Sequence, residues 1–443
     1  MSKFTRHIAA AAIALLFASS AAAQLLPSLS LPPISAPVQL PNAPVVGPVV
    51  QDLLGQPQVQ QAISPTLHSV RGLPQTIAQS GAPTLLELRR LRLQQLIREN
   101  RALLEKGDDG EPVRRGVIIA LNPDMLSLQL VARAGFRIIA DETEPQLGIR
   151  VVQLAVPRGK SAGSALKLAR RVAPRLNVDF DHIFEPAGGS LAPLPAALAA
   201  SSGAASGRVI GMIDGGVASH PSLSAARIEQ NGFSGSPQPT GHGTAVASLL
   251  VGSQGPFRGA ATGAQLFVAD VYGGNRAAGS ATAIIRALGW LLKHRPDVIN
   301  VSLVGPQNKA VERAVRIVRA RGIHIVAAVG NDGPAAPPQY PASYPGVIAV
   351  TGVDAHGRAL PEAGRTPNLD FAAPGSDMAA ALPGQGYASV RGTSFAAPLA
   401  AARLAAAGSP ARLAAEARPG KGRVGRGIVC GGCRVEPRAV GAR

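Results

Sequence analysis

GTSFAAPLAAA at residues 392–402 places a serine, Ser394, at the start of a predicted helix. A serine hydroxyl is a weak nucleophile until a neighbouring base takes its proton. The N-terminus of a helix offers free backbone N–H groups, which can stabilise an oxyanion. The stretch therefore predicts an exposed nucleophile, and it requires a base, with a residue that orients the base, elsewhere in the chain.

Two upstream stretches supply such residues. GHGTAVAS at residues 241–248 contains His242, and VIGMIDGGV at residues 209–217 is an apolar run that reaches Asp214. Such a run is typical of a buried strand that delivers a carboxylate to the edge of a sheet. Each piece alone has a structural interpretation, because serine caps helices and aspartate caps loops. Their combination favours a catalytic set.

With these stretches the chain resembles the subtilisin-like serine proteases, the subtilases, whose catalytic residues occur in the order Asp, His, Ser. The similarity extends over roughly residues 207–408 and includes VINVSL at 298–303, AAVGNDG at 327–333, YPA at 340–342, VIAVTG at 347–352 and APG at 373–375. The resemblance implies a catalytic triad of Asp214, His242 and Ser394. It also implies that the Asn331 side chain donates a hydrogen bond to the oxyanion.

The same resemblance implies that peptide substrates lie extended beside a four-residue strand and pair with its main chain, at Ser302, Leu303, Val304 and Gly305. Two residues depart from the family pattern. Gly215 stands where Thr or Ser is more common, which we expect to loosen the surroundings of Asp214. Val304 stands where glycine is common, so its side chain should narrow a subsite. The sequence therefore leaves open which side chain is preferred directly before the cleaved bond, although an apolar pocket for that side chain is the family default.

Strands and helices alternate between residues 208 and 329. Strands are predicted at 208–213, 266–271, 298–302 and 323–329, with helices beginning at 243 and covering 281–292 and 310–320. This alternation predicts an α/β fold with a doubly wound parallel sheet of the subtilisin type, in which sites lie at the carboxyl ends of strands. The predicted catalytic domain covers residues 208–436, followed by a tail at 437–443. Within it, residues 424–429 resemble a late strand of the family.

The N-terminus predicts export. Lys3, Arg6 and His7 precede an apolar run at 8–17, and small residues follow up to Ala23, which predicts a signal peptide over residues 1–23. The run is too short to span a membrane, so no transmembrane segment is expected beyond the signal. We expect a secreted, periplasmic or cell-surface protein.

Four further segments precede the catalytic domain. Residues 24–83 are rich in proline and should be extended and mobile. Residues 84–111 predict an amphipathic helix, over 84–106, and a linker; we expect the helix to pack on a neighbour, with a membrane surface as the alternative.

Residues 112–186 predict the β-α-β-β-α-β order of a small ferredoxin-like α+β domain, which resembles the inhibitory propeptide of subtilases. An unrelated small domain is the alternative. Residues 187–207 predict an exposed Ala/Ser/Gly linker.

Cys430 and Cys433 are the only cysteines. In an exported protein this pair predicts a local disulfide, with free thiols as the main alternative. No metal site is expected there, because no further cysteine or histidine lies nearby. The predicted chemistry requires no cofactor. Calcium is common in the family, but the sequence shows no readable calcium loop.

The formal net charge of +18 comes from scattered basic residues, and aromatic residues make up 3% of the chain. Without interleaved aromatics we expect a cationic surface rather than a nucleic-acid partner.

An inactive binding protein and a cationic structural protein are the competing functions. Both make the triad dispensable, and the presence of its three residues with Asn331 argues against them. We expect a serine endopeptidase that acts on proteins or peptides and is made as a self-processing zymogen, with its own propeptide as a partner.

Overall fold

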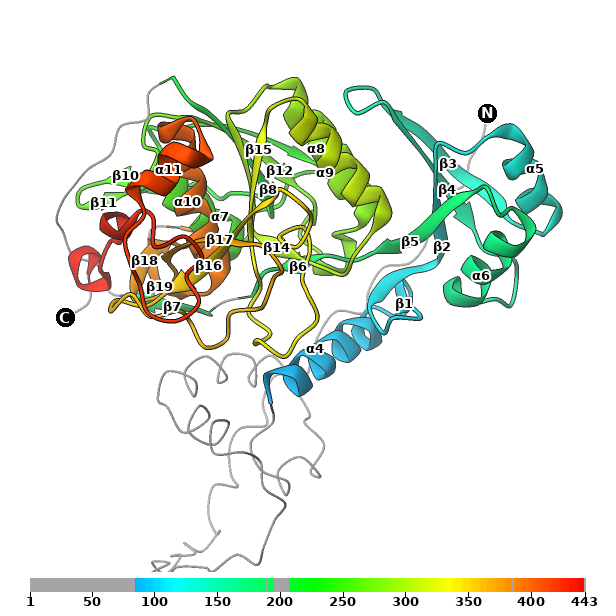
Figure 1. Cartoon of the computed structure of the whole chain (residues 1–443), viewed down its shortest axis with the longest axis horizontal. Coiled ribbons are helices and arrows are strands. Elements are labelled where there is room, and N and C mark those ends of the chain that lie inside the picture. Colours follow the sequence, from blue (N-terminus) through cyan, green and yellow to red (C-terminus); the bar gives the residue numbers. More distant parts are fainter. Residues whose placement is uncertain (1–83, 189, 195–206, 385, 442–443) are drawn as a thin grey trace, which may run out of the picture. The chain divides into compact units, whose positions relative to one another are not determined.

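The computed structural model describes residues 84–188, 190–194, 207–384 and 386–441 (Figure 1). The predicted signal peptide, the proline-rich segment and residues 195–206 of the predicted linker lie outside these ranges.

The central sheet of the catalytic unit has seven strands in the order β17-β16-β15-β13-β8-β12-β9, and every neighbouring pair is parallel. The strands are β8 (Val209–Asp214), β9 (Arg227–Gly232), β12 (Gln265–Asp270), β13 (Val298–Val301), β15 (His324–Ala328), β16 (Ile348–Val353) and β17 (Leu369–Pro374). The central strands are apolar at almost every position, as expected for strands covered on both faces.

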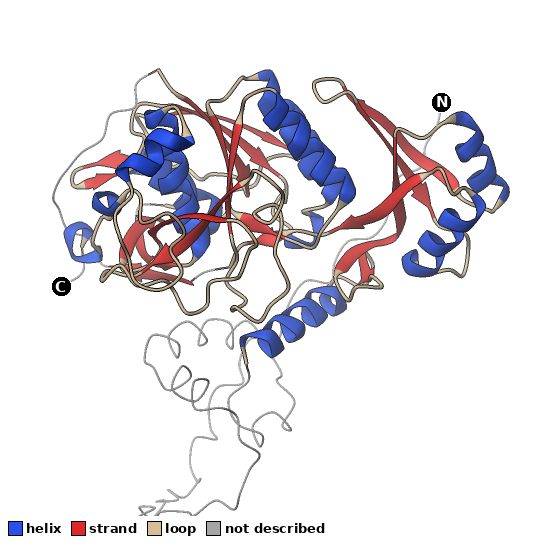
Figure 2. Cartoon of the chain, viewed as in Figure 1, coloured by secondary structure: helices blue, strands red, loops and turns tan. Residues whose placement is uncertain are grey.

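Helices cover both faces of this sheet (Figure 2). They are α7 (Gly241–Val251), α8 (Ala281–Lys293), α9 (Lys309–Ala320) and α10 (Thr393–Ala407). One apolar core joins α7 and α10 to alternate strand residues such as Met212 and Val326. A second joins α8 and α9 to the intervening residues, such as Ile213 and Ile325. The predicted doubly wound α/β fold is confirmed.

Shorter elements surround the sheet. The strands are β6 (Glu185–Pro186), β7 (Ser190–Leu194), β10 (Ser253–Gln254), β11 (Phe257–Arg258), β14 (Leu303–Val304), β18 (Met378–Ala381) and β19 (Tyr387–Arg391). The helix α11 (Pro410–Glu416) follows α10, and the 3₁₀ turns are η1 (Pro221–Leu223), η2 (Arg276–Ala278), η3 (Gly431–Cys433) and η4 (Pro437–Val440).

The unit before the catalytic sheet has the predicted order β-α-β-β-α-β. Its elements are β2 (Pro112–Leu121), α5 (Met125–Arg133), β3 (Arg137–Glu144), β4 (Ile149–Ala155), α6 (Ala162–Val172) and β5 (Asn177–His182). The strands pair antiparallel in the order β5-β2-β4-β3, which is the ferredoxin-like arrangement. The unit has its own apolar core, built from β2, β4, β5 and the inner faces of α5 and α6.

The predicted helix at 84–106 is shorter than expected. Helix α4 (Leu85–Glu99) begins with a capping box between Thr84 and Glu87 and ends at Asn100, whose N–H and side chain both donate to the carbonyl of Leu96. Strand β1 (Leu104–Lys106) then pairs with β2, because the edge of that sheet offers unpaired main-chain groups there. Leu88 and Leu93 are buried, so α4 packs on its neighbours as the first interpretation expected.

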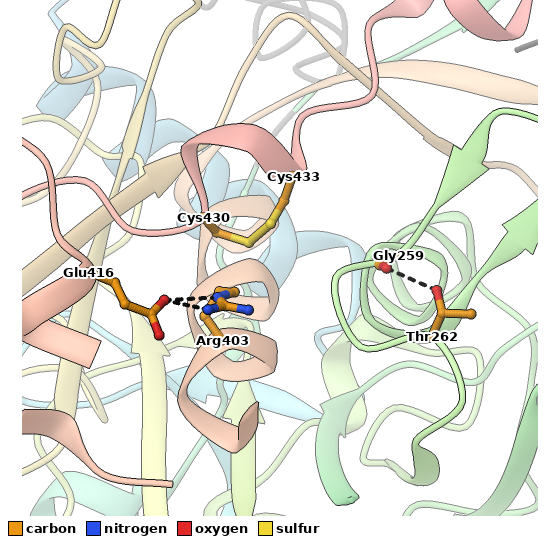
Figure 3. Close-up of a disulfide and its surroundings, with 6 residues drawn as sticks. All are labelled: Gly259, Thr262, Arg403, Glu416, Cys430 and Cys433. Atoms are coloured by element: carbon orange, nitrogen blue, oxygen red, sulfur yellow. Dashed lines mark hydrogen bonds and ion pairs between the residues drawn. A yellow bond between two sulfur atoms is a disulfide. The ribbon is translucent and has the colours of Figure 1, made fainter. Parts of the chain in front are cut away.

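The predicted strand at residues 424–429 is wrong. Only Ile428 forms β-bridges, with Ala372 and Arg418. Gly425 and Gly427 have φ values of 63° and 131°, which interrupt an extended chain. The chain then reaches Cys430 and Cys433, which are joined by a disulfide beside Arg403 of α10 and Glu416 of α11 (Figure 3).

Buried ion pairs connect α4 to the rest of the chain. The guanidinium of Arg89 lies 2.8 Å from the carboxylate of Glu111 and 3.2 Å from that of Asp332, and all three side chains are nearly inaccessible to solvent. Arg92 lies 2.9 Å from Asp332 as well. Burial raises the pKa of the Glu111 carboxyl, and the charge of Arg89 opposes that rise. The buried carboxylate of Glu111 therefore depends on Arg89 to remain charged.

We predict that Arg89→Met destabilises the chain, because it leaves the buried carboxylate of Glu111 without its cation, a loss worth about 3–5 kcal/mol. Thermal unfolding should be compared in chains that also carry Ser394→Ala, so that no self-cleavage intervenes. The Tm should fall by several degrees. Arg90→Met is the matched control, since Arg90 lies on the exposed side of the same helix. Equal Tm values for the two variants would contradict the prediction.

Candidate active site

The buried Asp214 and the partly buried His242 form a hydrogen-bonded pair. Asp214 is the last residue of β8, and its carboxylate accepts a hydrogen bond from the N–H of Gly215 at 2.7 Å. His242 is the second residue of α7, and its Nδ1 lies 2.9 and 3.0 Å from the two oxygens of Asp214. When Nδ1 carries the hydrogen of this bond, the lone pair of Nε2 is available to accept a proton. Nε2 is buried and has no hydrogen-bond partner within the described part of the chain.

Ser394 is the second residue of α10, directly after Gly392 and Thr393. Its carbonyl accepts a hydrogen bond from the hydroxyl of Ser302 at 2.8 Å, and the Ser302 hydroxyl is itself held by the side-chain amide of Asn300 at 2.9 Å. These contacts join the start of α10 to the carboxyl end of β13. The sheet thereby fixes the position of the serine.

The amide of Asn331 has a defined orientation. Its Oδ1 accepts a hydrogen bond from the N–H of Thr393 at 2.9 Å, and the N–H of Gly330 donates to Oγ1 of Thr393 at 3.1 Å. Because the oxygen faces α10, Nδ2 faces the other way, towards the carbonyls of Ala187 and Gly188, to which it donates. The sequence resemblance pointed to Asn331, but nothing in the sequence indicated that Thr393 would orient it.

The segment that leaves the ferredoxin-like unit occupies the site. Strand β6 pairs antiparallel with β14, with Pro186 opposite Leu303 and Glu185 opposite Val304. The N–H of Ala187 donates to the carbonyl of Ser302 at 2.9 Å. The strand predicted to bind substrate therefore pairs with the chain's own residues. Gly305, the last of the four predicted substrate-binding residues, provides space for a buried side chain. A Cβ on Gly305 would lie 2.5 Å from the ring of Phe184.

Two expectations about this region are wrong. Ser394 is not exposed but fully buried, and its Oγ donates to the carbonyl of Gly188 at 3.2 Å. The predicted linker is not exposed from its first residue, since residues 187–188 lie in the site and β7 pairs antiparallel with β19. The physical reason is the same for both. The free edges of β14 and β19 satisfy the main-chain groups of the segment on either side of Ser394.

The two departures from the family pattern have local explanations. A Cβ on Gly215 would lie 2.4 Å from Oγ1 of Thr240, so a threonine on the neighbouring segment fills the space beside Asp214. That Oγ1 also caps α7 by accepting from the N–H of Gly243 at 3.0 Å. Val304 is buried, and its Cγ1 lies 3.5 Å from where a Cβ of Gly330 would stand.

Two residues beside the site were not singled out from the sequence. Tyr272 and Arg276 line a cavity of about 230 Å³ together with Asp214 and His242. The hydroxyl of Tyr272 is buried without a partner among the described residues. Burial raises its pKa well above the ordinary value, and the negative charge of Asp214 raises it further. Tyr272 therefore stays neutral beside Asp214.

The described ranges contain no group of three or more His, Cys, Asp or Glu side chains arranged to hold a metal ion. None of the helices in these ranges is both long and apolar enough to cross a membrane.

Comparison with known proteins agrees with this geometry. The model of the subtilase family matches residues 205–414. Subtilisin Savinase of Lederbergia lenta is 34% identical over 199 residues, which cover 44% of this chain and 73% of that protein. An alkaline protease of Alkalihalobacillus alcalophilus is 34% identical over 199 residues, 44% of this chain, and the match spans about half, 52%, of its length.

The crystal structure of fervidolysin from Fervidobacterium pennivorans, a keratinolytic enzyme, superimposes with a TM-score of 0.61 at 20% identity. The superposition covers 74% of this chain and 62% of that one, and it supports the fold. The match to the family model over residues 205–414 and the 34% identity to Savinase over 73% of its length lead to one conclusion: the chain belongs to the subtilase family of serine endopeptidases.

Proposed function

We propose that this protein is an exported subtilase zymogen that cleaves its own pro-region and then hydrolyses peptide bonds through Asp214, His242 and Ser394. One observation carries the proposal. A segment of the chain itself lies on the substrate strand, with two of its carbonyls beside the amide of Asn331 and one of them bonded to the hydroxyl of Ser394. This is the arrangement of a peptide held for attack at a serine.

In the proposed reaction, Oγ of Ser394 attacks the carbonyl carbon while its proton passes to Nε2 of His242. Asp214 holds the Nδ1–H and stabilises the imidazolium that forms. The peptide bond then breaks, the imidazolium gives its proton to the leaving amine, and the segment remains bound as an ester on Ser394. Water, deprotonated by the same imidazole, releases it.

The negative charge of the tetrahedral oxygen needs two donors. The amide Nδ2 of Asn331 is one, and the backbone N–H of Ser394, at the open end of α10, is the other. The bond from Thr393 to Oδ1 of Asn331 supports this role, because it keeps Nδ2 directed at the carbonyl before the charge develops.

We assign the scissile bond to Ala187–Gly188. Ala187 is the last residue whose N–H pairs with the substrate strand, and its small side chain is buried in the catalytic core. Gly188, with a φ of 64°, turns the chain out of the strand. The alternative is the bond after Gly188, since the carbonyl of that residue accepts from Ser394.

The proposal of a zymogen rests on coverage of the site. Residues 184–188 and β7 occupy the positions that a substrate needs on both sides of Ser394, so the uncut chain cannot bind another peptide there. Export rests on the signal pattern of residues 1–23 in the sequence.

We predict that the wild-type chain cuts itself and that the Ser394→Ala chain does not, because only the serine can attack. Both should be expressed in parallel, and the N-terminus of the mature fragment should be determined by mass. The fragment is expected to begin at Gly188; a fragment lighter by one glycine would move the scissile bond to the far side of that residue. Processing of both chains alike would show that another protease matures the protein.

We predict that Asn331→Leu slows self-cleavage by roughly 10²- to 10³-fold, the loss that the relative subtilisin shows for a side-chain donor of this kind. The measurement is the first-order rate of cleavage after refolding, which is intramolecular and therefore independent of protein concentration. Circular dichroism controls for the fold. Cleavage at the wild-type rate would remove Asn331 from the oxyanion site.

A further inference from the structure

The segment before the proposed scissile bond lies between two walls, and both belong to the catalytic unit. Strand β14 forms the first wall. The second is the turn around η2, where the carbonyl of Gly279 accepts from the N–H of Phe184 at 2.7 Å and Ser280 forms a bridge with Ile183. Asn275 caps this turn through the N–H of Ala277 at 2.9 Å. The turn therefore has a fixed backbone, and its side chains remain when the pro-region departs.

Glu185 is the residue of this segment that pairs with Val304. It is 5% exposed, and its two carboxylate oxygens meet different arginines. One oxygen lies 3.4 Å from Nη2 of Arg276, and the other lies 3.4 Å from Nε of Arg92. Arg92 also binds Asp332, at 2.9 Å, and belongs to α4 of the pro-region. Arg276 belongs to the catalytic unit.

Cleavage and release of the pro-region remove Glu185 and Arg92 together. Arg276 then keeps its place on η2, at the mouth of the cavity that contains Asp214 and His242. Its only ion pair within the described ranges is the one with Glu185. A fixed turn thus presents the guanidinium of Arg276 to the substrate residue that takes the place of Glu185 opposite Val304.

We propose that Arg276 is a specificity-determining residue that selects an acidic side chain at the substrate position paired with Val304. This inference deepens the proposed function, on which it rests, by naming a substrate class: extended peptides with an aromatic residue, then an acidic one, then proline and a small residue, in the order of Phe184, Glu185, Pro186 and Ala187. Arg276 touches the substrate side chain but none of the reacting atoms.

The exposure of the Arg276 side chain to solvent determines how large a change in kcat/KM we expect. The side chain of Arg276 is 56% exposed even when Glu185 is bound, and pairs of this kind are individually weak. Exchange of Glu for Lys converts attraction into repulsion. We therefore expect a difference of roughly five- to twentyfold in kcat/KM between the two peptides at low salt, and a smaller one at high salt.

The test uses the processed enzyme and three fluorogenic peptides, Phe-Xaa-Pro-Ala, in which Xaa is Glu, Gln or Lys. The wild type should prefer Glu over Gln and Gln over Lys. Arg276→Gln should remove the preference, and Arg276→Glu should reverse it; each ratio of kcat/KM is taken between peptides on one variant, so a general change in activity cancels. Arg316→Gln, on the exposed side of α9, is the matched control for net charge.

An unchanged Glu-to-Lys ratio in Arg276→Glu would overturn the assignment. Failure of the enzyme to cleave any of the three peptides would instead count against the proposed function. In that case, fluorescence anisotropy of the same peptides on the same variants decides the question about Arg276: reversed binding preference supports it, and identical binding of the Glu and Lys peptides to wild type refutes it.

Discussion

The hydrogen bond between Nδ1 of His242 and the carboxylate of Asp214 depends on where the sheet ends. Asp214 is the last residue of β8, so its carboxylate projects at the carboxyl edge of the parallel strands. The same edge carries Ser302, just after β13, and Asn331, a few residues after β15. A parallel sheet brings such residues together because all its strands end on one side. Helix α10 begins against this edge, and the ring of Phe395, the residue after Ser394, lies 5.3 Å from the ring of His242.

Main-chain pairing, rather than side-chain recognition, holds the chain's own segment over the serine. Strand β14 pairs with the residues before Ala187, and β19 pairs with residues 190–194 after it. Extended chains of many sequences can satisfy such hydrogen bonds. Discrimination must then come from the side chains that contact the catalytic unit, among them the enclosed ring of Phe184, the carboxylate of Glu185 and the buried methyl group of Ala187. In the zymogen that we propose, this segment would block the site before cleavage and would also resemble the substrates that the free site binds.

The sequence predicted much of the fold and the residues of the site, because apolar periodicity and glycine-framed motifs are local signals. The strands and helices predicted between 208 and 329 agree with the structure to within a few residues, and the order of the ferredoxin-like unit agrees as well, whereas the edge strand β9 was not predicted. The wrong predictions concern features that depend on backbone conformation at single glycines or on contacts between distant segments. Residues 424–429 looked like a strand, but positive φ at Gly425 and Gly427 breaks it. The burial of Ser394 and the strand β7 depend on pairing between distant segments, which no local pattern carries.

The ion pairs of α4 give the covering segment a second attachment. Asp332 is adjacent to Asn331, and it binds both Arg89 and Arg92. Arg92 in turn binds Glu185, two residues before Ala187 and the proposed scissile bond. Cutting the chain breaks one covalent bond but none of these contacts. In the zymogen that we propose, release of residues 1–187 would require the buried carboxylate of Asp332 to exchange two guanidinium partners for water. This exchange, together with the loss of the β6–β14 pairing, would set how long the cut segment stays on the site.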